Sequence, residues 1–487
     1  MNPKMENERM TSDVNHDGPF SMIEKKNSEK VISNRESPSE KRTSIIIFVI
    51  AMASFIGPLE SMIYMPGLLS IANYFHASHS AVNASISSFM IFMGISPLIW
   101  ATLSEKYGRR KMFLLSSMIN IVASFLCICS SNIWMLVVFR GLQSGGANAA
   151  HTLGAGVISD IIPIEQRGRA YALFSLGGLL GPIVGPSIGG ILSEVYGWQS
   201  IFYFLTLLGI VQLYFKKNNT SHHTQTNQLS SHTILLLLQS PTVWIISLFN
   251  TTIYSSLYFL NPTITHTFQT LYGFNEWQVG LCYLPFGIGL MIGSIFSGWY
   301  SDRILGKLET DVTSSSSSTT TDDIKNDNIL SSSVESRLLA TIPSFLCIPA
   351  GFLVYGLTVE CNTIFYAPLI GLFIFAFGQM SAFTPTTVYL VDSNPGLSAT
   401  AVGISHSIRC LTASITTFYS NQVLDVLGPG TLFTGLAFLN MMNCLLVLIC
   451  IKYGESWRHS FDIKHKSTFV NDQLIKHLTE SSSSIRY

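Results

Sequence analysis

The 487-residue sequence is apolar and poor in charge: 48% of its residues are hydrophobic, 11% are charged, and its mean hydropathy is +0.38. Soluble proteins carry about 25% charged residues, so this composition excludes an ordinary soluble protein and favours one whose solvent is a bilayer. Lys plus Arg and Asp plus Glu balance at 28 each, so the net charge points neither to nucleic acid nor to an anionic membrane surface as a partner.

Twelve apolar runs are long enough to cross a hydrocarbon core about 30 Å thick, which needs about 20 residues per helix. The first six predicted helices are 43–64, 81–103, 112–130, 133–157, 170–193 and 199–215. The second six are 241–262, 277–300, 338–358, 363–390, 398–420 and 431–452. The sequence therefore predicts an all-α membrane protein.

Polar segments separate these helices into two sets of six. The predicted order is a cytoplasmic tail 1–42, a six-helix bundle 43–215, a linker 216–240, a second bundle 241–452 and a tail 453–487. Within the second bundle, the Ser/Thr-rich stretch 304–337 predicts a flexible cytoplasmic loop, whose serines are either a solvated linker or phosphorylation sites. The first 42 residues lack the features of a signal peptide, so we expect the first membrane helix to act as the targeting signal.

The distribution of basic residues predicts the orientation, because Lys and Arg are retained on the cytoplasmic side. If the N-terminus is inside, 25 of the 28 basic residues lie in cytoplasmic tails and loops, Lys452 lies at the cytoplasmic end of the last predicted helix, and none lies in the six outer loops. The other two, Arg140 and Arg409, lie within helices. We therefore expect both termini to be cytoplasmic. Seven of the eight cysteines lie in apolar runs, and only Cys361 falls in a predicted outer loop, which indicates neither a disulfide framework nor a zinc site.

A weak internal repeat relates the two halves. The second helix ends in ATLSEKYGRR at 101–110, and the eighth ends in GWYSDR at 298–303. The two segments lie at equivalent places in the two sets of six helices. Two parallel halves around a central cavity are an architecture found in transporters.

Further motifs carry a resemblance to a known family. They are LVVFRGLQSGGANAA at 136–150 and GPIVGPSIGG at 181–190, together with IYMP at 63–66, YLVD at 389–392 and the segment around Arg409. With the 101–110 loop, they resemble the signature motifs of the major facilitator superfamily, in particular its drug:proton antiporter branch with twelve spans. Within that branch the chain is similar to the fungal quinidine-resistance and dityrosine transporters.

The resemblance implies a fold of two pseudo-symmetric six-helix bundles and transport by alternating access. It implies that Arg140 matches a fourth-helix arginine associated with proton coupling, and that the 101–110 segment is a gating loop. The family's loop opens with Gly and carries Asp, whereas this chain has Ala101 and Glu105. The Gly-Pro segment looks like the branch's antiporter motif, and the plasma membrane is the implied location.

Charged side chains inside membrane helices are costly and mark a site or a pathway. Glu60, Arg140 and Arg409 lie within the predicted helices 1, 4 and 11. Glu60 is a candidate proton carrier, against the alternative of a carboxylate near the headgroups. His151 lies about three turns after Arg140 on the same face, and His406 precedes Arg409 by three residues, so both histidines are further proton-coupling candidates, although either could simply be packed.

Two elements are candidates for the conformational change. In helix 5, Gly181, Gly185 and Gly189 recur every four residues and leave a face without side chains, while Pro186 and Gly190 complete the motif. We expect this helix to bend and seal the cavity, with generic close packing as the alternative. The gating loop is predicted from its charges and its turn, and it is either a latch between the halves or a membrane anchor. Its residues, together with those of the reduced second copy, are Glu105, Lys106, Gly108, Arg109, Arg110, Asp302 and Arg303.

The candidate substrate cavity is aromatic with a few polar groups, which suits amphiphilic compounds. Helix 7 carries four such positions on one face, of which Asn261 is the last. The candidates are Tyr64, Gln143, Asn148, Asn250, Tyr254 and Tyr258, and simple packing is the alternative.

The sequence contains no nucleotide-binding loop, metal-spaced cluster or nucleophile–base arrangement, so we expect no enzyme activity, no cofactor and no metal. The predicted function is a proton-coupled antiporter that exports small amphiphilic compounds such as drugs, weak organic acids or related metabolites. The predicted partners are a small-molecule substrate, protons and the lipid bilayer, without nucleic acid or nucleotide, and the chain is expected to be monomeric. A nutrient-uptake symporter and a non-transporting membrane sensor remain alternatives.

Overall fold

The computed structural model describes residues 40–149, 153–154, 158, 164–219, 240–315, 335–394 and 398–483. The chain divides into two compact units, Met1–Ile45 and Ile46–Tyr487, and the membrane helices belong to the second. Within the described ranges the structure is helical and contains no strand. His151 lies outside the described residues, so its predicted position beside Arg140 stays a prediction.

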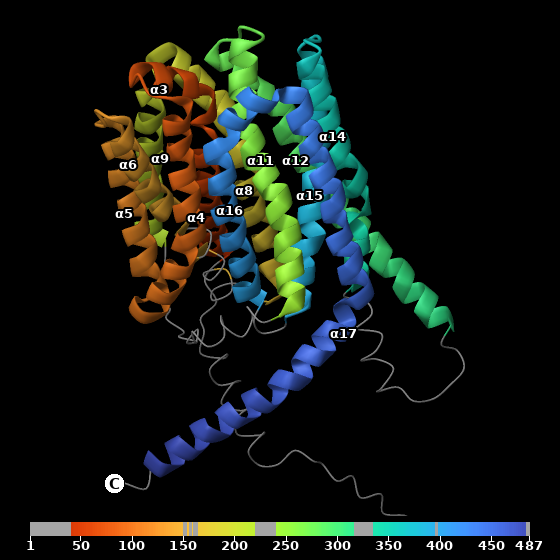
Figure 1. Ribbon diagram of the computed structural model, residues 1–487. Coiled ribbons are helices and arrows are strands. Elements are labelled where there is room, and N and C mark those ends of the chain that lie inside the picture. The colour runs from red at the N-terminus through yellow and green to blue at the C-terminus, as the bar shows by residue number, and fades with distance from the viewer. Residues whose placement is uncertain are drawn as a thin grey trace, which may run out of the picture. The chain divides into compact units, whose positions relative to one another are not determined.

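The first half contains six helical segments (Figure 1). They are α2 (Glu40–Met62) with its continuation through the 3₁₀ turn η1 (Met65–Gly67) into α3 (Leu68–Tyr74), α4 (His79–Tyr107), α5 (Arg109–Ile128), α6 (Ile133–Ala147), α8 (Ile164–Tyr196) and α9 (Gln199–Asn219). The break after α2 coincides with Pro66, whose ring supplies no backbone donor for a regular helix.

The second half also contains six. They are α11 (Pro241–Thr270), α12 (Glu276–Ser315), the turn η2 (Arg337–Thr341) leading into α14 (Ile342–Glu360), α15 (Tyr366–Asp392), α16 (Ser398–Leu427) and α17 (Pro429–Ser483). The described ranges thus hold twelve helical segments, nine of which are long and apolar enough to cross a membrane. The predicted all-α membrane fold is confirmed.

The two largest extensions beyond the predicted bounds are in α12 and α17. The predicted loop 304–337 is helical through Ser315, and α17 continues through the predicted tail to Ser483. Both extensions lack proline, which would end a helix. Of the predicted span 133–157, α6 covers Ile133–Ala147, and 150–152 and 155–157 lie outside the described residues.

The two halves meet through the pairs α4 with α16 and α8 with α12. The hydrogen bonds that join them lie toward one end of the bundle, which carries α3 and is at the top of Figure 1; we call it the α3 end. Gln422 Nε2 donates to Ser80 Oγ at 2.7 Å, and Asn83 Nδ2 donates to Ser420 Oγ at 3.1 Å. Nearer the middle, Ser407 Oγ donates to the carbonyl of Gly94 at 2.7 Å.

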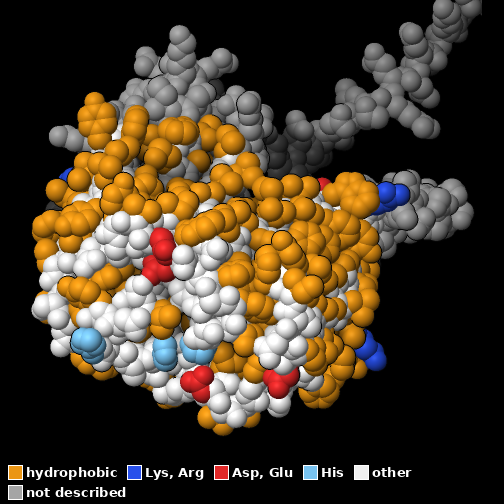
Figure 2. All heavy atoms as spheres, turned by 90° about the horizontal axis from the view of Figure 1, so that it is seen from above, with side chains coloured by type: hydrophobic (Ala, Val, Ile, Leu, Met, Phe, Trp, Pro, Cys, Tyr) orange, Lys and Arg blue, Asp and Glu red, His pale blue; other side chains and the backbone are white. Residues whose placement is uncertain are grey.

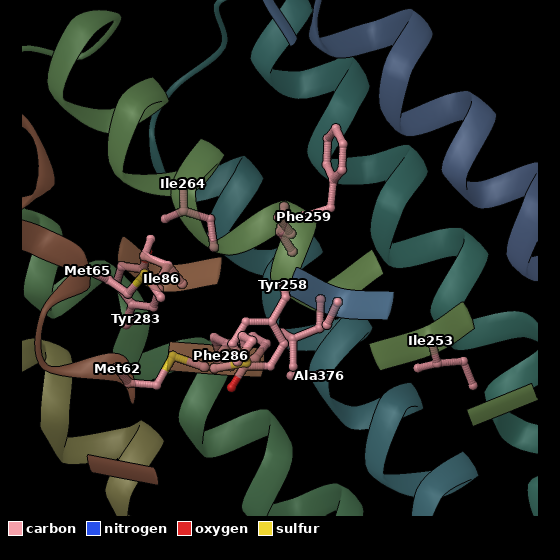
Figure 3. Packing of buried hydrophobic residues seen from close by; sticks show 14 of the residues in the cluster. Met62, Met65, Ile86, Ile253, Tyr258, Phe259, Ile264, Tyr283, Phe286 and Ala376 are labelled. Carbon is pink, nitrogen blue, oxygen red and sulfur yellow. The ribbon is translucent and has the colours of Figure 1, made fainter. Parts of the chain in front are cut away.

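Buried apolar side chains connect the halves beneath these bonds (Figure 3). Met62 ends α2 and Met65 begins η1, whereas Tyr258 comes from α11 and Tyr283 and Phe286 come from α12. All five are at most 3% exposed. Tyr283 donates its hydroxyl proton to the carbonyl of Asn261 at 2.7 Å, which satisfies this polar group inside the core.

The outward faces of the helices carry large apolar side chains. Phe125, Leu207, Ile295, Leu346 and Phe438 are each more than half exposed and come from five different helices. In water this much exposed apolar surface would be unfavourable, whereas hydrocarbon is an equivalent solvent for it. The fold therefore presents the surface of a membrane protein.

Candidate functional site

A carboxylate and a guanidinium lie together inside the first half. Glu60 on α2 and Arg140 on α6 are both 0% exposed. Both terminal nitrogens of Arg140 donate to the main-chain carbonyl of Glu60 at 3.2 Å, and Nη1 also donates to Gln143 Oε1 at 2.8 Å. The carboxyl group of Glu60 accepts a hydrogen bond from Asn120 Nδ2 at 2.8 Å through Oε1. Its Oε2 is buried without a hydrogen-bond partner, so this oxygen is free to hold a proton.

Aromatic rings enclose the Arg140 cation. Its guanidinium carbon lies 4.6 Å from the ring centre of Tyr64, 4.5 Å from that of Phe89 and 5.9 Å from that of Phe202. Ring faces attract a cation, and desolvation strengthens that attraction. The cage therefore holds Arg140 charged and away from water.

Arg409 on α16 is the counterpart in the second half. It is 7% exposed, and its guanidinium carbon lies 4.7 Å from the Tyr254 ring centre and 4.4 Å from that of Phe383. Its Nη2 lies 2.7 Å from His406 Nδ1, as their three-residue spacing on one helix led us to expect. Its Nε has no hydrogen-bond partner.

Two tyrosines of α11 lie beside the second charged centre. Tyr254 packs on Arg409, and the rings of Tyr254 and Tyr258 lie 4.8 Å apart. Tyr258 is 3% exposed and belongs to the same apolar core as Met62 of α2. The two tyrosines therefore connect the surroundings of Arg409 with the core between the halves.

The glycine motif of α8 packs against the helix that carries Glu60. A Cβ on Gly181 would lie 2.6 Å from the backbone nitrogen of Leu59, and one on Gly185 would lie 3.2 Å from that of Ile63. Gly189 also faces Ile63. On its other side α8 crosses to the second half: Gly190 faces the backbone of Glu276, and Pro186 faces Gly280. The predicted antiporter motif thus lies between α2 and α12.

The predicted gating loop is a one-residue turn. Gly108 has φ +91°, a conformation that favours glycine, and it separates α4 from α5. Lys106 lies over the Tyr107 ring at 5.3 Å, and Arg109 and Arg110 begin α5. The side chain of Glu105 lies outside the described residues.

The second copy of this loop differs in shape, because α12 runs through it without a turn. Asp302 and Arg303 are exposed, and Arg303 lies 5.2 Å from the Trp299 ring centre. No latch between Asp302 or Arg303 and the first half is described.

Most predicted cavity residues are buried in hydrogen-bonded contacts. Gln143 donates to Ser124 Oγ at 2.8 Å, Asn148 packs against Gly57, and Asn250 accepts a hydrogen bond from Thr386 at 3.0 Å. Tyr64 and Tyr258 are at most 3% exposed, and Tyr254 is partly exposed. Their place in a substrate cavity stays a prediction.

The sequence did not predict two ion pairs within the second half. Arg337 Nε lies 2.6 Å from Asp392 Oδ2, and Arg458 Nη2 lies 3.2 Å from Glu335 Oε2. Burial raises the pKa of the Glu335 carboxyl, and Arg458 opposes that shift. Asp392 belongs to the YLVD motif at the end of a predicted helix, and Arg337 lies just before the start of another. Opposite charges at two predicted helix ends were the signal that could have found the first pair. These contacts join η2 to the end of α15 and the segment before η2 to α17.

The α3 end carries histidines and carboxylates. His79 of α4 and His266 of α11 contact edge to face, with ring centroids 5.3 Å apart. Ser70 donates to Glu276 Oε1, and the Glu276 backbone N–H donates to Glu194 Oε2 at 3.1 Å. Figure 2 looks onto this face and shows acidic and histidine side chains, with Lys and Arg only at its edge. No group of three or more His, Cys, Asp or Glu side chains in the described residues could hold a metal.

Two six-helix halves with an apolar outer surface and buried charged side chains in each half define a multi-pass membrane transport protein. The family model described as Major Facilitator Superfamily matches residues 45–417, and the chain belongs to that superfamily.

The curated relatives are fungal transporters. The chain is 29% identical over 451 residues to "MFS-type transporter hepF" of Aspergillus oryzae, covering 86% of this chain and 89% of that protein. It is 24% identical over 567 residues to "MFS antiporter QDR3" of Candida albicans, covering 86% and 79%. It is 27% identical over 490 residues to "Citrate exporter 1" of Aspergillus niger, covering 92% of each. The resemblance to the major facilitator superfamily that the sequence motifs indicated is confirmed.

Solved structures share the fold. A bacterial homologue of the human lysosomal transporter Spinster, described as inward-facing and unoccupied, matches with a TM-score of 0.62 at 12% identity, covering 87% of this chain and 98% of that one. A D-xylose-proton symporter matches with a TM-score of 0.65, also at 12% identity, covering 83% and 97%.

Proposed function

We propose that this transporter is a proton-coupled antiporter that exports small amphiphilic compounds, and that Glu60 is its proton carrier. The observation that carries the proposal is the environment of Glu60. Its carboxyl group is fully buried, one oxygen is hydrogen-bonded to Asn120, and the other has no partner. Burial favours the neutral carboxyl, whereas the Arg140 cation favours the ionised one, so a modest change in surroundings suffices to load or release a proton.

Alternating access supplies that change. The contacts described between the halves lie at the α3 end or toward the middle, which fits a state that is closed at that end. The basic residues of the tails and loops make the α3 end the external one, with both termini cytoplasmic. The conformer described is then closed to the outside. In the opposite conformer, Glu60 exchanges its proton with the outside.

The glycine motif of α8 links the helix that carries Glu60 to the contact between the two halves. Because α8 lies directly on α2 beside Leu59 and Ile63 and also on α12, a shift of α8 moves the backbone around Glu60. Packed interfaces tend to occupy discrete arrangements, so the contact can switch rather than deform gradually. This supports coupling between proton binding and closure.

The export direction and the location rest on similarity. Relatives are named as an antiporter and as an exporter of citrate, which supports export of small compounds by this chain. We place the protein in the plasma membrane, where a proton gradient directed inward can drive export, and expect it to act as a monomer.

A reconstituted transport assay tests the proposal. The purified chain in liposomes, screened against toxic organic acids, cationic drugs and polyamines, is expected to move at least one compound faster when a pH gradient is imposed. Glu60→Gln removes the titratable group while keeping its size, and is expected to abolish the response to the pH gradient while leaving gradient-independent exchange.

Asp425→Asn is the matched control, because it neutralises an exposed carboxylate at the α3 end, and its response to the gradient should equal that of the unaltered protein. Transport that continues unchanged after the proton gradient is collapsed would contradict the proposal.

A further inference from the structure

We propose that Arg409 is the anchor of a substrate-binding subsite for an anionic group, so that the exported compounds include amphiphilic carboxylates. That these carboxylates are exported rests on the proposed function. The subsite itself is a property of α11, α15 and α16, and binding can be measured without transport.

The first argument is an uncompensated charge. Arg140 donates to the main-chain carbonyl of Glu60 and to Gln143, whereas the described ion pairs and hydrogen bonds give Arg409 only the contact with His406. Its described polar contact is with His406, and its Nε hydrogen lacks an acceptor although the side chain is 7% exposed. A buried cation without an anion is unfavourable, so an anionic ligand has a large favourable interaction to make here.

The second argument is the direction from which a ligand can approach. The guanidinium carbon lies over the rings of Tyr254 and Phe383, 4.7 and 4.4 Å from their centres. The N–H bonds of a guanidinium point outward in its own plane, and that of Nε has no described acceptor. A planar carboxylate matches that fork and can accept two hydrogen bonds at once, which a neutral or cationic group cannot.

The third argument is access. Although Arg409 is buried, three of its neighbours, Tyr254, Phe383 and His406, are partly exposed. Gly403 lies one turn before His406 on α16, and a Cβ there would meet nothing within 4 Å. The side chains around Arg409 thus reach the surface although its guanidinium is buried, and the two rings offer apolar surface to the body of an amphiphile.

The chemistry of the pair favours binding over proton transfer. Arginine does not release its proton in proteins, so Arg409 is a fixed charge. Because the guanidinium is donor-only, His406 Nδ1 accepts at 2.7 Å, which leaves the ring proton of a neutral imidazole on Nε2. We therefore assign Arg409 to substrate binding and His406 to its orientation, in place of the proton-coupling function predicted from sequence.

Ligand binding to the purified full-length chain tests this assignment. The probes are amphiphilic mono-, di- and tricarboxylates, each paired with its neutral amide and with an ammonium compound of the same carbon skeleton. Binding is measured by calorimetry and by ligand-induced thermal shift. At least one carboxylate should bind, and its amide and ammonium partners should bind about 10-fold more weakly or not at all.

Arg409→Gln should weaken carboxylate binding by about 10- to 100-fold, the usual loss for a hydrogen-bonded charge. Arg409→Lys should recover part of it, because the charge is kept and the two-point geometry is lost. Lys452→Gln is the matched control, since Lys452 also lies over an aromatic ring, at 5.3 Å from the Tyr453 centre, but is exposed. Its carboxylate affinity should not change.

The outcomes separate this inference from the proposed function. If amides or ammonium compounds bind as tightly as carboxylates, or if a folded Arg409→Gln or Arg409→Lys protein keeps full carboxylate affinity, the subsite is wrong, whatever drives transport. If carboxylates bind through Arg409 but no compound moves in response to a proton gradient, the subsite stands and the proton-coupled mechanism fails.

Discussion

Individual residues show two ways of keeping a positive charge inside this bundle. Arg140 is held by directed bonds to the Glu60 carbonyl and to Gln143, within a ring of aromatic faces. Arg409 has the aromatic faces and one described polar partner, His406. The Nε of each arginine is buried without an acceptor, so the two differ in the number of their other directed bonds, and the proposed anionic ligand would supply those that Arg409 lacks.

Arg140→Lys should therefore destabilise the protein although it conserves the charge. A lysine cannot bond to the Glu60 carbonyl and to Gln143 with the same fork, and a lost hydrogen bond to a charged group costs about 1.5–3 kcal/mol. The apparent melting temperature of the purified protein should fall. Arg303→Lys changes an exposed arginine beside Trp299 and should shift stability by no more than about 0.5 kcal/mol. Equal shifts in the two variants would contradict this account of Arg140.

Among the elements, α8 has the least room. Its glycine face approaches the α2 backbone so closely that Gly181→Ala would bring a methyl group to 2.6 Å from the nitrogen of Leu59. The helices must then separate, and we expect transport activity to fall at least tenfold together with a lower melting temperature, since overpacking typically costs about 1–3 kcal/mol.

Gly298→Ala is the matched control for this element. A Cβ on Gly298 would meet nothing within 4 Å, and alanine is the better helix former by up to about 1 kcal/mol. The variant should be as stable as the unaltered protein or slightly more so. A loss of activity in Gly298→Ala as large as in Gly181→Ala would show that helix flexibility, and not close packing, is what the glycines provide.

Helix positions were predictable from sequence because hydropathy is a local property. Each predicted span coincides with a helical segment, and Gly108 separates α4 from α5 where the motif placed the turn. The ends of α12 and α17 were not predictable in the same way, because a polar segment without proline carries no signal that distinguishes a helix continuing into water from a loop.

At the scale of the whole molecule, the two halves must separate at the α3 end for transport to proceed. Ser80→Cys combined with Gln422→Cys places thiols where a hydrogen bond of 2.7 Å now joins α4 to α16. In a background without the exposed Cys129 and Cys361, a short reducible thiol crosslinker should stop transport, and reduction should restore it.

A second cysteine pair tests whether that effect is specific to the contact between halves. Glu360→Cys and Gly430→Cys lie within the second half, where a Cβ on Gly430 would be 3.2 Å from the Glu360 Cβ. Crosslinking there should leave transport intact. If both pairs block transport, or neither does, the α3 end is not the surface that opens.

The long-range part of the site could not be predicted from the chain alone. The spacing of His406 and Arg409 on one helix was visible, but the enclosure of Arg140 by Tyr64, Phe89 and Phe202 involves α4, α6, α9 and the turn after α2, and no local pattern specifies which helices are neighbours. The same holds for the contact of Tyr254 with Arg409, which joins α11 to α16. Such contacts follow from the order in which the helices pack, which the family resemblance implied and the residues did not.

The bonds that close the α3 end are mostly made by hydroxyl and amide groups, such as Ser80 with Gln422 and Asn83 with Ser420, while both described ion pairs lie inside one half. Water can replace each neutral bond as it breaks, at a net cost of about 0.5–1.5 kcal/mol. The hydrogen bonds that close the α3 end can therefore break one at a time as water replaces them, and neither described ion pair has to be separated first. This keeps the free-energy barrier between the two conformers low enough for repeated turnover.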